Sequence, residues 1–360
     1  MKFGVERCPN GEPGYVCLPA LRWLGCREFK DNSIHRFVSR LRVRDPERSV
    51  RFYQECLGMT LIDRYDFPQF DFSLYFLESR APGAPEYALE PGSPEAHRYL
   101  WSMPGVALEL THNHGSEEVY HPGNSEGDGF GHLAVSVPDV YAACAELESA
   151  GVAFHKKPDE GRMKGLAFAL DPDGYWLEIV KRGEAEGGEG GGGPTFRLAQ
   201  TMLRVKDPKE SIAFYREHFN MTLVRESHYD SFSNYFLASL ESPGGPAVPP
   251  SPDPAGPDAR AYVYDELYPR CVPVLELTHN HGTEDDAEFS YANGNEEGRR
   301  GFGHTGFLVD DVYAFSAELE AAGVAFHKRP DEGGMKGLAF ARDPDGYLVE
   351  IIRRGQAGDF

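Results

Sequence analysis

One eight-residue stretch, LELTHNHG, occurs twice in this chain, at residues 108–115 and 275–282. In a strand, its leucines would point to one face and the central glutamate, Glu109 or Glu276, to the other. Acidic side chains are disfavoured in strands, and an inward carboxylate must lose its water. An isolated glutamate of this kind is usually solvated on an outer face. Its recurrence beside other matched polar residues instead indicates a positively charged partner.

Further side chains of the metal-ligand type recur at equivalent places in the two halves. One histidine follows each GFG, one glutamate lies in each of GYWLEIV and GYLVEII, and a glutamine opens a strand in the second half. These residues are His132, His304, Glu178, Glu350 and Gln200. One imidazole, two carboxylates and an amide suit a borderline divalent cation, with water or substrate in its remaining positions. The alternative, that the histidines belong to turns or a core, does not explain four matched positions.

The elements that carry these residues form an internal duplication. YQECLGMTL (53–61) matches YREHFNMTL (215–223), and AGVAFHK, MKGLAF and DPDGY each occur twice. A long repeat predicts two copies of one domain, with loop insertions between matched motifs. Residues 184–194, EAEGGEGGGGP, have the composition of a flexible linker. We therefore expect an N-terminal extension over 1–34, a first domain over 35–183, the linker, and a second domain over 195–360.

Each half contains a weaker repeat of strand, helix and three strands. In the first half the pattern predicts strands at 37–43, 60–66, 72–77 and 106–112, then at 131–137, 153–156, 165–170 and 175–180. Asp45 before Pro46 marks the start of one helix, and residues 139–150 form the other. The fold class is thus α+β, with four βαβββ units paired into two domains. The Pro-rich segments 80–98 and 241–259 are expected to be exposed, mobile loops.

Composition restricts the partners. The chain has 360 residues and a formal net charge of −21, which argues against nucleic acid and anionic membranes. Any anionic ligand must therefore be held by a local group of basic residues. Six cysteines are sparse for this length and do not repeat between the halves, which favours a reducing compartment. Without a membrane-length apolar run or a typical leader, the expected location is the cytoplasm.

These ordered motifs resemble those of glyoxalase I, the lactoylglutathione lyase family of the vicinal-oxygen-chelate superfamily. QTMLRVKDP (200–208) and the paired LELTHNHG, GFGH, MKGLAF and DPDGY carry the resemblance, which spans about residues 37–353. The chain looks like the single-chain duplicated form of fungi and protists, in which two fused halves replace a homodimer. The resemblance thus implies glyoxalase-type domains and a monomer.

The resemblance also implies a reaction. The substrate would be the hemithioacetal of glutathione and methylglyoxal, isomerised through an enediolate to S-D-lactoylglutathione. A divalent metal, zinc with nickel or cobalt as alternatives, would act as Lewis acid. Glu178 or Glu350 would be both ligand and catalytic base. The implied metal ligands are Gln200, Glu276, His132, Glu178, Glu109, His304 and Glu350. The implied substrate-binding residues are Arg204, Asn280, Lys156, Met163, Arg42, Asn113, Arg300, Lys328 and Met335.

Two departures fall in the first half. Val38 stands where the second half has Gln200, and Asp128, which would repel a carboxylate, stands where it has Arg300. In the family, each site joins the first unit of one copy to the second unit of the other. That crossed pairing would complete one metal site, from Gln200, Glu276, His132 and Glu178, and would degrade the other. Halves closed on themselves would instead leave the second half intact.

Two other functions are weighed against this one. A non-catalytic or differently active relative could bind glutathione conjugates or a metal, since the first half shows losses. An extradiol dioxygenase would need two histidines and one carboxylate on iron, which the glutamine, two glutamates and histidine fit poorly.

Overall fold

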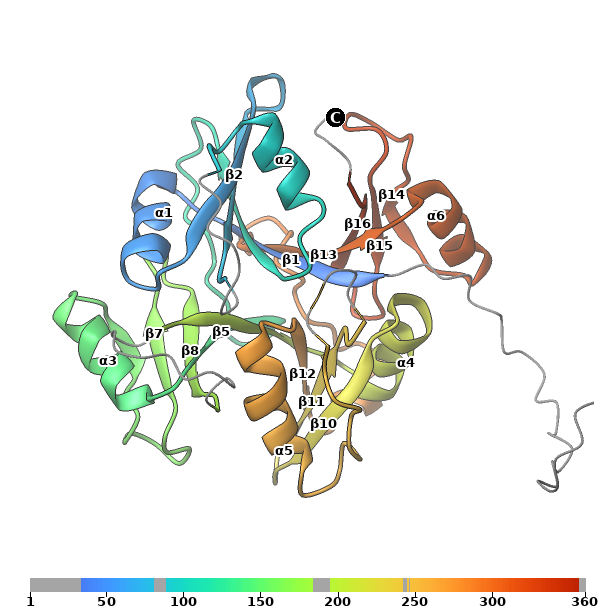
Figure 1. The fold of residues 1–360 in the computed structure, drawn as a ribbon. Coiled ribbons are helices and arrows are strands. Elements are labelled where there is room, and N and C mark those ends of the chain that lie inside the picture. The colour runs from blue at the N-terminus through green and yellow to red at the C-terminus, as the bar shows by residue number, and fades with distance from the viewer. Residues whose placement is uncertain (1–33, 81–88, 184–194, 242–244, 246, 356–360) are drawn as a thin grey trace, which may run out of the picture. The chain divides into compact units, whose positions relative to one another are not determined.

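The computed structural model describes residues 34–80, 89–183, 195–241, 245 and 247–355 (Figure 1). The predicted linker and nearly all of the predicted extension lie outside these residues. Across the described ranges, none of the helices has the length and apolar character needed to span a membrane.

The four predicted βαβββ units are present. The first comprises β1 (His35–Arg42), α1 (Pro46–Glu55), β2 (Thr60–Phe67), β3 (Phe72–Glu78) and β4 (Ala107–Asn113). The second comprises β5 (Phe130–Val137), α3 (Val140–Ser149), β6 (Phe154–Lys156), β7 (Ala167–Leu170) and β8 (Trp176–Lys181). The third comprises β9 (Arg197–Arg204), α4 (Pro208–Phe219), β10 (Thr222–His228), β11 (Phe232–Ala238) and β12 (Val274–Asn280). The fourth comprises β13 (Phe302–Val309), α6 (Val312–Ala321), β14 (Phe326–Lys328), β15 (Ala339–Arg342) and β16 (Leu348–Arg353).

Local sequence explains where these helices begin. Asp45 precedes α1 with extended backbone, and its carboxylate accepts a hydrogen bond from Arg48 N at 3.0 Å, with Pro46 at the first helical position. An aspartate caps each of the other three unit helices in the same way. Because these caps recur at matched positions, the duplication predicts the helix starts to within a residue.

One of the two loop predictions is wrong in part. Within 80–98, α2 (Pro94–Leu100) begins at Ser93, whose hydroxyl accepts from Ala96 N at 3.1 Å. Proline at the first turn is compatible with a helix because its missing N–H has no partner there, so a Pro-rich segment need not stay a loop. In the second segment the described residues are loop up to α5 (Ala259–Ala261). Short helical turns follow α5 at Tyr262–Leu267 and Tyr268–Arg270.

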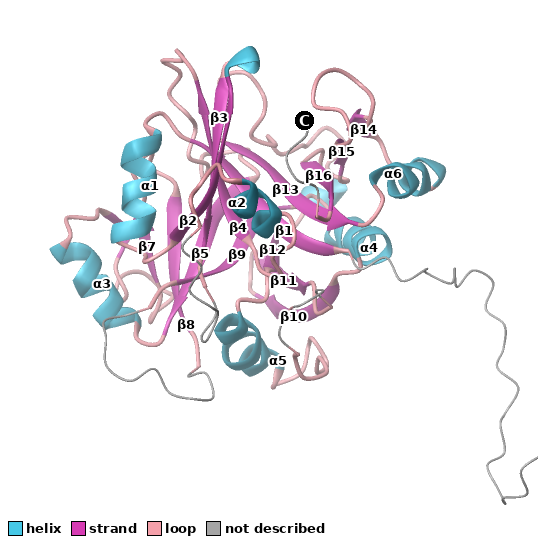
Figure 2. Ribbon diagram, turned by 45° about the horizontal axis from the view of Figure 1, so that its top comes forward, coloured by secondary structure: helices cyan, strands magenta, loops and turns pink. Residues whose placement is uncertain are grey.

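The strands of the described residues form two eight-stranded sheets that exchange units between the halves. One sheet has the order β14-β15-β16-β13-β1-β4-β3-β2, and the other β10-β11-β12-β9-β5-β8-β7-β6 (Figures 1 and 2). The two central junctions, β1 with β13 and β5 with β9, are antiparallel. The structure therefore shows the crossed pairing, and it excludes halves whose sheets close on themselves.

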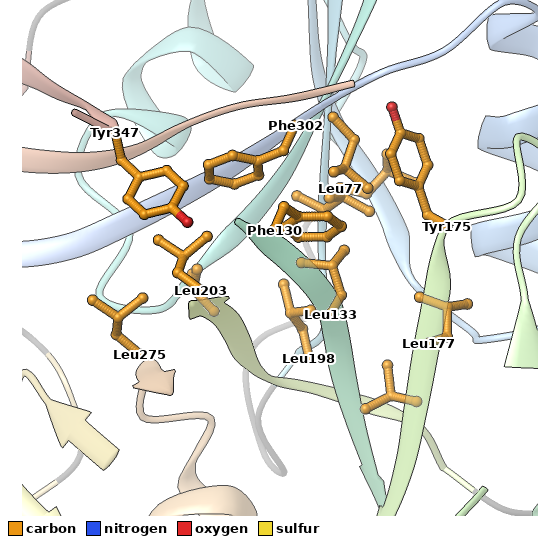
Figure 3. Close-up of a cluster of buried hydrophobic side chains, with 14 of the residues drawn as sticks. Leu77, Phe130, Leu133, Tyr175, Leu177, Leu198, Leu203, Leu275, Phe302 and Tyr347 are labelled. Carbon is orange, nitrogen blue, oxygen red and sulfur yellow. The ribbon is translucent and has the colours of Figure 1, made fainter. Parts of the chain in front are cut away.

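Ring stacking and hydrogen bonds join the two sheets. The Phe130 and Phe302 rings, one from each GFGH motif, stack with centroids 5.0 Å apart and planes 7° from parallel (Figure 3). Beside them Tyr175 donates to Arg42 O at 2.9 Å, and Tyr347 donates to Arg204 O at 2.8 Å. The histidine two residues after each phenylalanine lies on the same strand, β5 or β13, and so has a defined position in its sheet.

Candidate metal centres

The first centre lies on four adjacent central strands, β12, β9, β5 and β8. Glu276, Gln200, His132 and Glu178 each come from one of them, and all four are buried. The leucines flanking Glu276 point into the apolar core, so alternation directs the carboxylate to the opposite face. The prediction that the recurring glutamate is not a solvated outer-face residue is confirmed, because Glu276 and Glu109 are each 4% exposed.

The polar atoms of the first centre converge. His132 Nε2 lies 3.3 Å from Glu178 Oε2 and 3.5 Å from Glu276 Oε2. The Gln200 amide nitrogen donates to Glu178 Oε2 at 3.1 Å and to Glu276 Oε2, while the Tyr268 hydroxyl donates to the Gln200 amide oxygen. In this arrangement the Gln200 amide nitrogen, and not its oxygen, faces the two carboxylates. The sequence-predicted quartet is thus brought together.

Charge at this centre is concentrated on two carboxylates. Burial lowers the pKa of His132, but the carboxylates of Glu178 and Glu276 outweigh it and raise that pKa to about 9. Burial also raises the pKa of Glu276, against the opposing effect of His132. The site therefore favours any added positive charge.

The donor set fits a divalent cation. His132 Nε2 is buried without a well-aligned hydrogen-bond partner, although it faces two carboxylate oxygens. Ligand atoms of His132, Glu178 and Glu276 lie within 4.8 Å of one another, as do those of Glu109, His304 and Glu350 in the second sheet. A nitrogen and two carboxylates at this spacing, with an amide beside them, are ligands of borderline divalent ions.

Two residues that support this centre were missed by the sequence analysis. Asn234 on β11 donates to Glu276 Oε1 at 2.6 Å, and Thr278 donates to the Asn234 carbonyl at 3.1 Å. The signal was present, because FSNYFL in the second half reads FSLYFL in the first, with Leu74 in place of Asn234. Tyr268 gave no such signal, since it lies in an insertion between the matched motifs.

The second centre comes from the other sheet. His304 Nε2 lies 3.0 Å from Glu350 Oε2 and 3.5 Å from Glu109 Oε2, and all three side chains are buried. Val38 pairs with Gly306 in β13 just as Gln200 pairs with Ala134 in β5. The register thus supports the sequence comparison, and a methyl-bearing side chain stands where the first centre has an amide.

A cation that the sequence analysis missed also reaches the second centre. Arg40 Nε lies 3.4 Å from Glu109 Oε1 and donates to Thr111 Oγ1 at 2.6 Å, and Thr111 Oγ1 donates to Glu109 at 3.2 Å. At the first centre the matched position is Met202, which pairs with Glu276 in the strand register as Arg40 pairs with Glu109. The change from methionine to arginine was visible in the sequence.

The predicted substrate residues divide between the centres. Arg42, Asn113, Arg300 and Lys328 line a cavity of about 900 Å³ that Arg40 also lines. Met335 is partly buried against the cluster containing Val38. On the other sheet, Arg204, Asn280 and Lys156 are half-buried and hydrogen-bonded within the chain, and Met163 is exposed. Their roles in binding stay predictions.

Asp128 has a setting that its sequence position did not predict. The residue is 4% exposed, and Arg299 Nη1 lies 2.8 Å from its Oδ1. His121 Nδ1 lies 3.3 Å from Oδ2, and Ser125 N donates to the same oxygen at 2.6 Å. The carboxylate is thus buried and paired rather than presented as a free negative charge.

Comparison with known proteins agrees with the fold and the motifs. The family described as Glyoxalase/Bleomycin resistance protein/Dioxygenase superfamily matches residues 33–179 and again 197–351. The chain is 40% identical to a lactoylglutathione lyase of Schizosaccharomyces pombe, over 87% of this chain and 94% of that protein. It is 41% identical to glyoxalase I of Saccharomyces cerevisiae, over 88% and 91%.

A solved structure gives the same result. Glyoxalase I from Zea mays superposes with a TM-score of 0.61 at 26% sequence identity, over 90% of this chain and 93% of that chain. Both halves match the same domain family, and full-length relatives of known name align over most of their lengths. The chain belongs to the glyoxalase I, or lactoylglutathione lyase, family.

Proposed function

We propose that the protein isomerises the hemithioacetal of glutathione and methylglyoxal to S-D-lactoylglutathione, at one complete metal centre formed by His132, Glu178, Gln200 and Glu276. The observation that carries the proposal is the convergence of these four buried side chains on one face of a sheet. The names of full-length relatives support the reaction. Removal of methylglyoxal would be its physiological consequence.

A divalent cation, zinc in our proposal with nickel or cobalt as alternatives, would supply Lewis acidity toward two adjacent substrate oxygens. The chain would hold it through His132 Nε2 and the carboxylates of Glu178 and Glu276. The Gln200 amide oxygen, which accepts a hydrogen bond from Tyr268 in the structure, would become the fourth ligand after the amide turns over. Asn234 orients Glu276 by a hydrogen bond, the usual task of a residue around a metal site. Tyr268 holds the Gln200 side chain beside the centre.

Glu178 is the residue we assign to proton transfer. Both oxygens of Glu276 accept hydrogen bonds, Oε1 from Asn234 and Oε2 from Gln200, so this carboxylate is fixed. The contacts recorded for Glu178 fall on Oε2, and its side chain is 11% exposed compared with 5% for Glu276. The less constrained carboxylate is better placed to take a proton from the carbon bearing sulfur and return it to the neighbouring carbon.

Substrate binding beside this centre is assigned to Arg204, Asn280, Lys156 and Met163. The net charge of −21 makes such local cations necessary for an anionic substrate. The Lys156 ammonium lies close enough to Glu178 for their charges to interact. Lys156 thus places a cation near the proposed base.

The protein is also proposed to be a cytoplasmic monomer. Each sheet already combines a first unit with a second unit from the same chain, so both centres form without a second copy. A single peak at the monomer mass in size-exclusion chromatography with light scattering supports this state, and a dimer mass contradicts it.

The test of function is thioester absorbance in a mixture of glutathione and methylglyoxal. Turnover that is lost with a chelator and restored by added zinc, nickel or cobalt supports the proposal, and the restored rates rank the metals. Binding of glutathione conjugates without any thioester formation would favour the non-catalytic alternative.

A further inference from the structure

We propose that the second centre is a metal-free binding site for small carboxylate-bearing thioethers, in which Arg40 supplies the positive charge that a metal ion would carry. The class of ligand rests on the proposed function. The absence of metal from the second centre does not depend on turnover at the first centre. Four observations lead to it, from the charge, packing and cavity of the second centre.

The first observation is the charge beside the buried glutamate. Glu276 has two neutral neighbours, Asn234 and Gln200. The matched Glu109 instead faces the Arg40 guanidinium, with Thr111 bridging the two side chains. A guanidinium keeps its charge at any working pH. Glu109 therefore already has a fixed counter-ion, which would repel a divalent cation at the same carboxylate.

The second observation is the loss of the fourth ligand. Val38 is fully buried, and a Cβ added at Gly306 would lie 2.5 Å from its Cγ1. The valine thus fills the space against β13 with hydrocarbon. Leu74 replaces Asn234 in the matched motif as well. The three differences, Val38, Leu74 and Arg40, surround Glu109. The valine removes an oxygen ligand, the leucine removes a supporting amide, and the arginine adds a charge that repels a cation.

The third observation is the cavity that Arg40 lines beside the second centre. Its volume of about 900 Å³ is that of a binding site for a sizeable organic ligand. An inorganic anion would fill a small part of it.

The fourth observation is the sign of the cavity lining. Five arginine or lysine residues line it, Arg40, Arg42, Arg300, Lys328 and Arg342, against three acidic ones, Asp71, Glu118 and Glu296. Arg300 Nη1 lies 3.3 Å from Glu118 Oε2 and Arg40 Nε lies 3.4 Å from Glu109 Oε1, so a ligand carboxylate at either arginine would compete with these pairs. The lining is nevertheless net positive in a chain of net charge −21. A guanidinium binds carboxylate through paired hydrogen bonds, so carboxylate-bearing ligands suit this lining.

The first experiment counts bound zinc. Full-length protein is stripped with a chelator, dialysed to equilibrium against micromolar zinc at pH 7.5, and its metal content measured by mass spectrometry. We expect one zinc per chain for the parent and two for the double variant Val38→Gln/Arg40→Met, which copies Gln200 and Met202. Two zincs in the parent overturn the proposal. A folded double variant that still binds one zinc overturns the role given to these two residues.

The second experiment measures ligand binding in the presence of a chelator, so that turnover at the first centre plays no part. Calorimetric titration of stripped protein with S-methylglutathione is expected to show a binding site that Arg300→Ala weakens at least tenfold. The matched control is Arg204→Ala on the other sheet, which should leave that site's affinity within twofold. Absence of binding to stripped protein, or its loss in Arg204→Ala alone, overturns the proposal. If the protein lacked turnover yet passed both experiments, the proposed function would fail and this inference would stand.

Discussion

The substitution Asn234→Leu tests how the chain supports its metal centre. Leucine is close to asparagine in size and is the residue that the first half carries at the matched position. The change removes the 2.6 Å hydrogen bond to Glu276 Oε1 and leaves the Thr278 hydroxyl without the Asn234 carbonyl as acceptor. The lost bond joins a neutral amide to a buried carboxylate.

The magnitude follows from that chemistry. A hydrogen bond to a charged group is worth about 1.5–3 kcal/mol, and loss of a residue that orients a metal ligand typically costs about 10–100-fold in metal affinity. At about 1.4 kcal/mol per factor of ten in the equilibrium constant, the two ranges agree. We therefore expect zinc affinity to fall about 10- to 100-fold, with a matching need for more zinc to reach full activity.

The assay is competition for zinc against a chromophoric chelator at fixed pH. Leu74→Asn, the reverse exchange beside the second centre, is the matched control and should leave zinc affinity at the first centre unchanged. If Asn234→Leu binds zinc as tightly as the parent while circular dichroism shows it folded, the hydrogen bond does not orient Glu276 and the reasoning is wrong.

Three further predictions concern stability and metal removal. Burial, and to a smaller extent the nearby charge of Arg354, lower the pKa of His35 to about 4. Between pH 6.5 and 4 the His35 side chain is therefore protonated in the unfolded chain but not in the folded chain. The free energy of unfolding should therefore fall by up to about 3 kcal/mol between pH 6.5 and 4. In urea titrations, His35→Gln should lose less unfolding free energy over this range than the parent. The same pH dependence in both proteins would refute the role given to His35. Tyr53→Phe removes a 2.9 Å hydrogen bond from the buried Asp171 carboxylate. It should lower the free energy of unfolding by about 1–3 kcal/mol in the same titrations. The control is Tyr141→Phe at an exposed position, which should change this free energy by almost nothing, and equal effects of the two substitutions would contradict the prediction. Stripping the metal should lower the melting temperature, because zinc at a hundred times its dissociation constant stabilises by about 2.7 kcal/mol. An unchanged melting temperature would contradict a zinc site that forms only in the folded chain.

Duplication made much of the site predictable. A single glutamate in a strand has many explanations. Because Glu109 and Glu276 both lie between leucines, the repeat predicts a strand, places the glutamate on the face opposite the leucines, and indicates a metal ligand. The same comparison identified Val38 as the missing ligand position. The helix starts were predictable as well, because a capping aspartate accepts hydrogen bonds from backbone groups only a few residues away.

Features that depend on contacts between distant strands were not predictable. Crossed and self-closed pairing use the same strand patterns, so the pairing of β1 with β13 had to come from the structure. Arg40 reads in sequence as one basic residue in a basic strand, and its contact with Glu109 arises only when β1 and β4 pair. Tyr268 reaches Gln200 from an insertion that has no matched sequence in the first half.

The central claim, one complete centre with Glu178 as its base, is tested most directly by comparing turnover of Glu178→Gln and Glu350→Gln. Both residues occupy the same position in matched strands, β8 and β16. Glutamine keeps size and hydrogen bonding but cannot accept the proton. With zinc at saturation, we predict that kcat falls at least a hundredfold in Glu178→Gln and by less than twofold in Glu350→Gln. Equal losses in the two variants, or a loss confined to Glu350→Gln, would contradict the account.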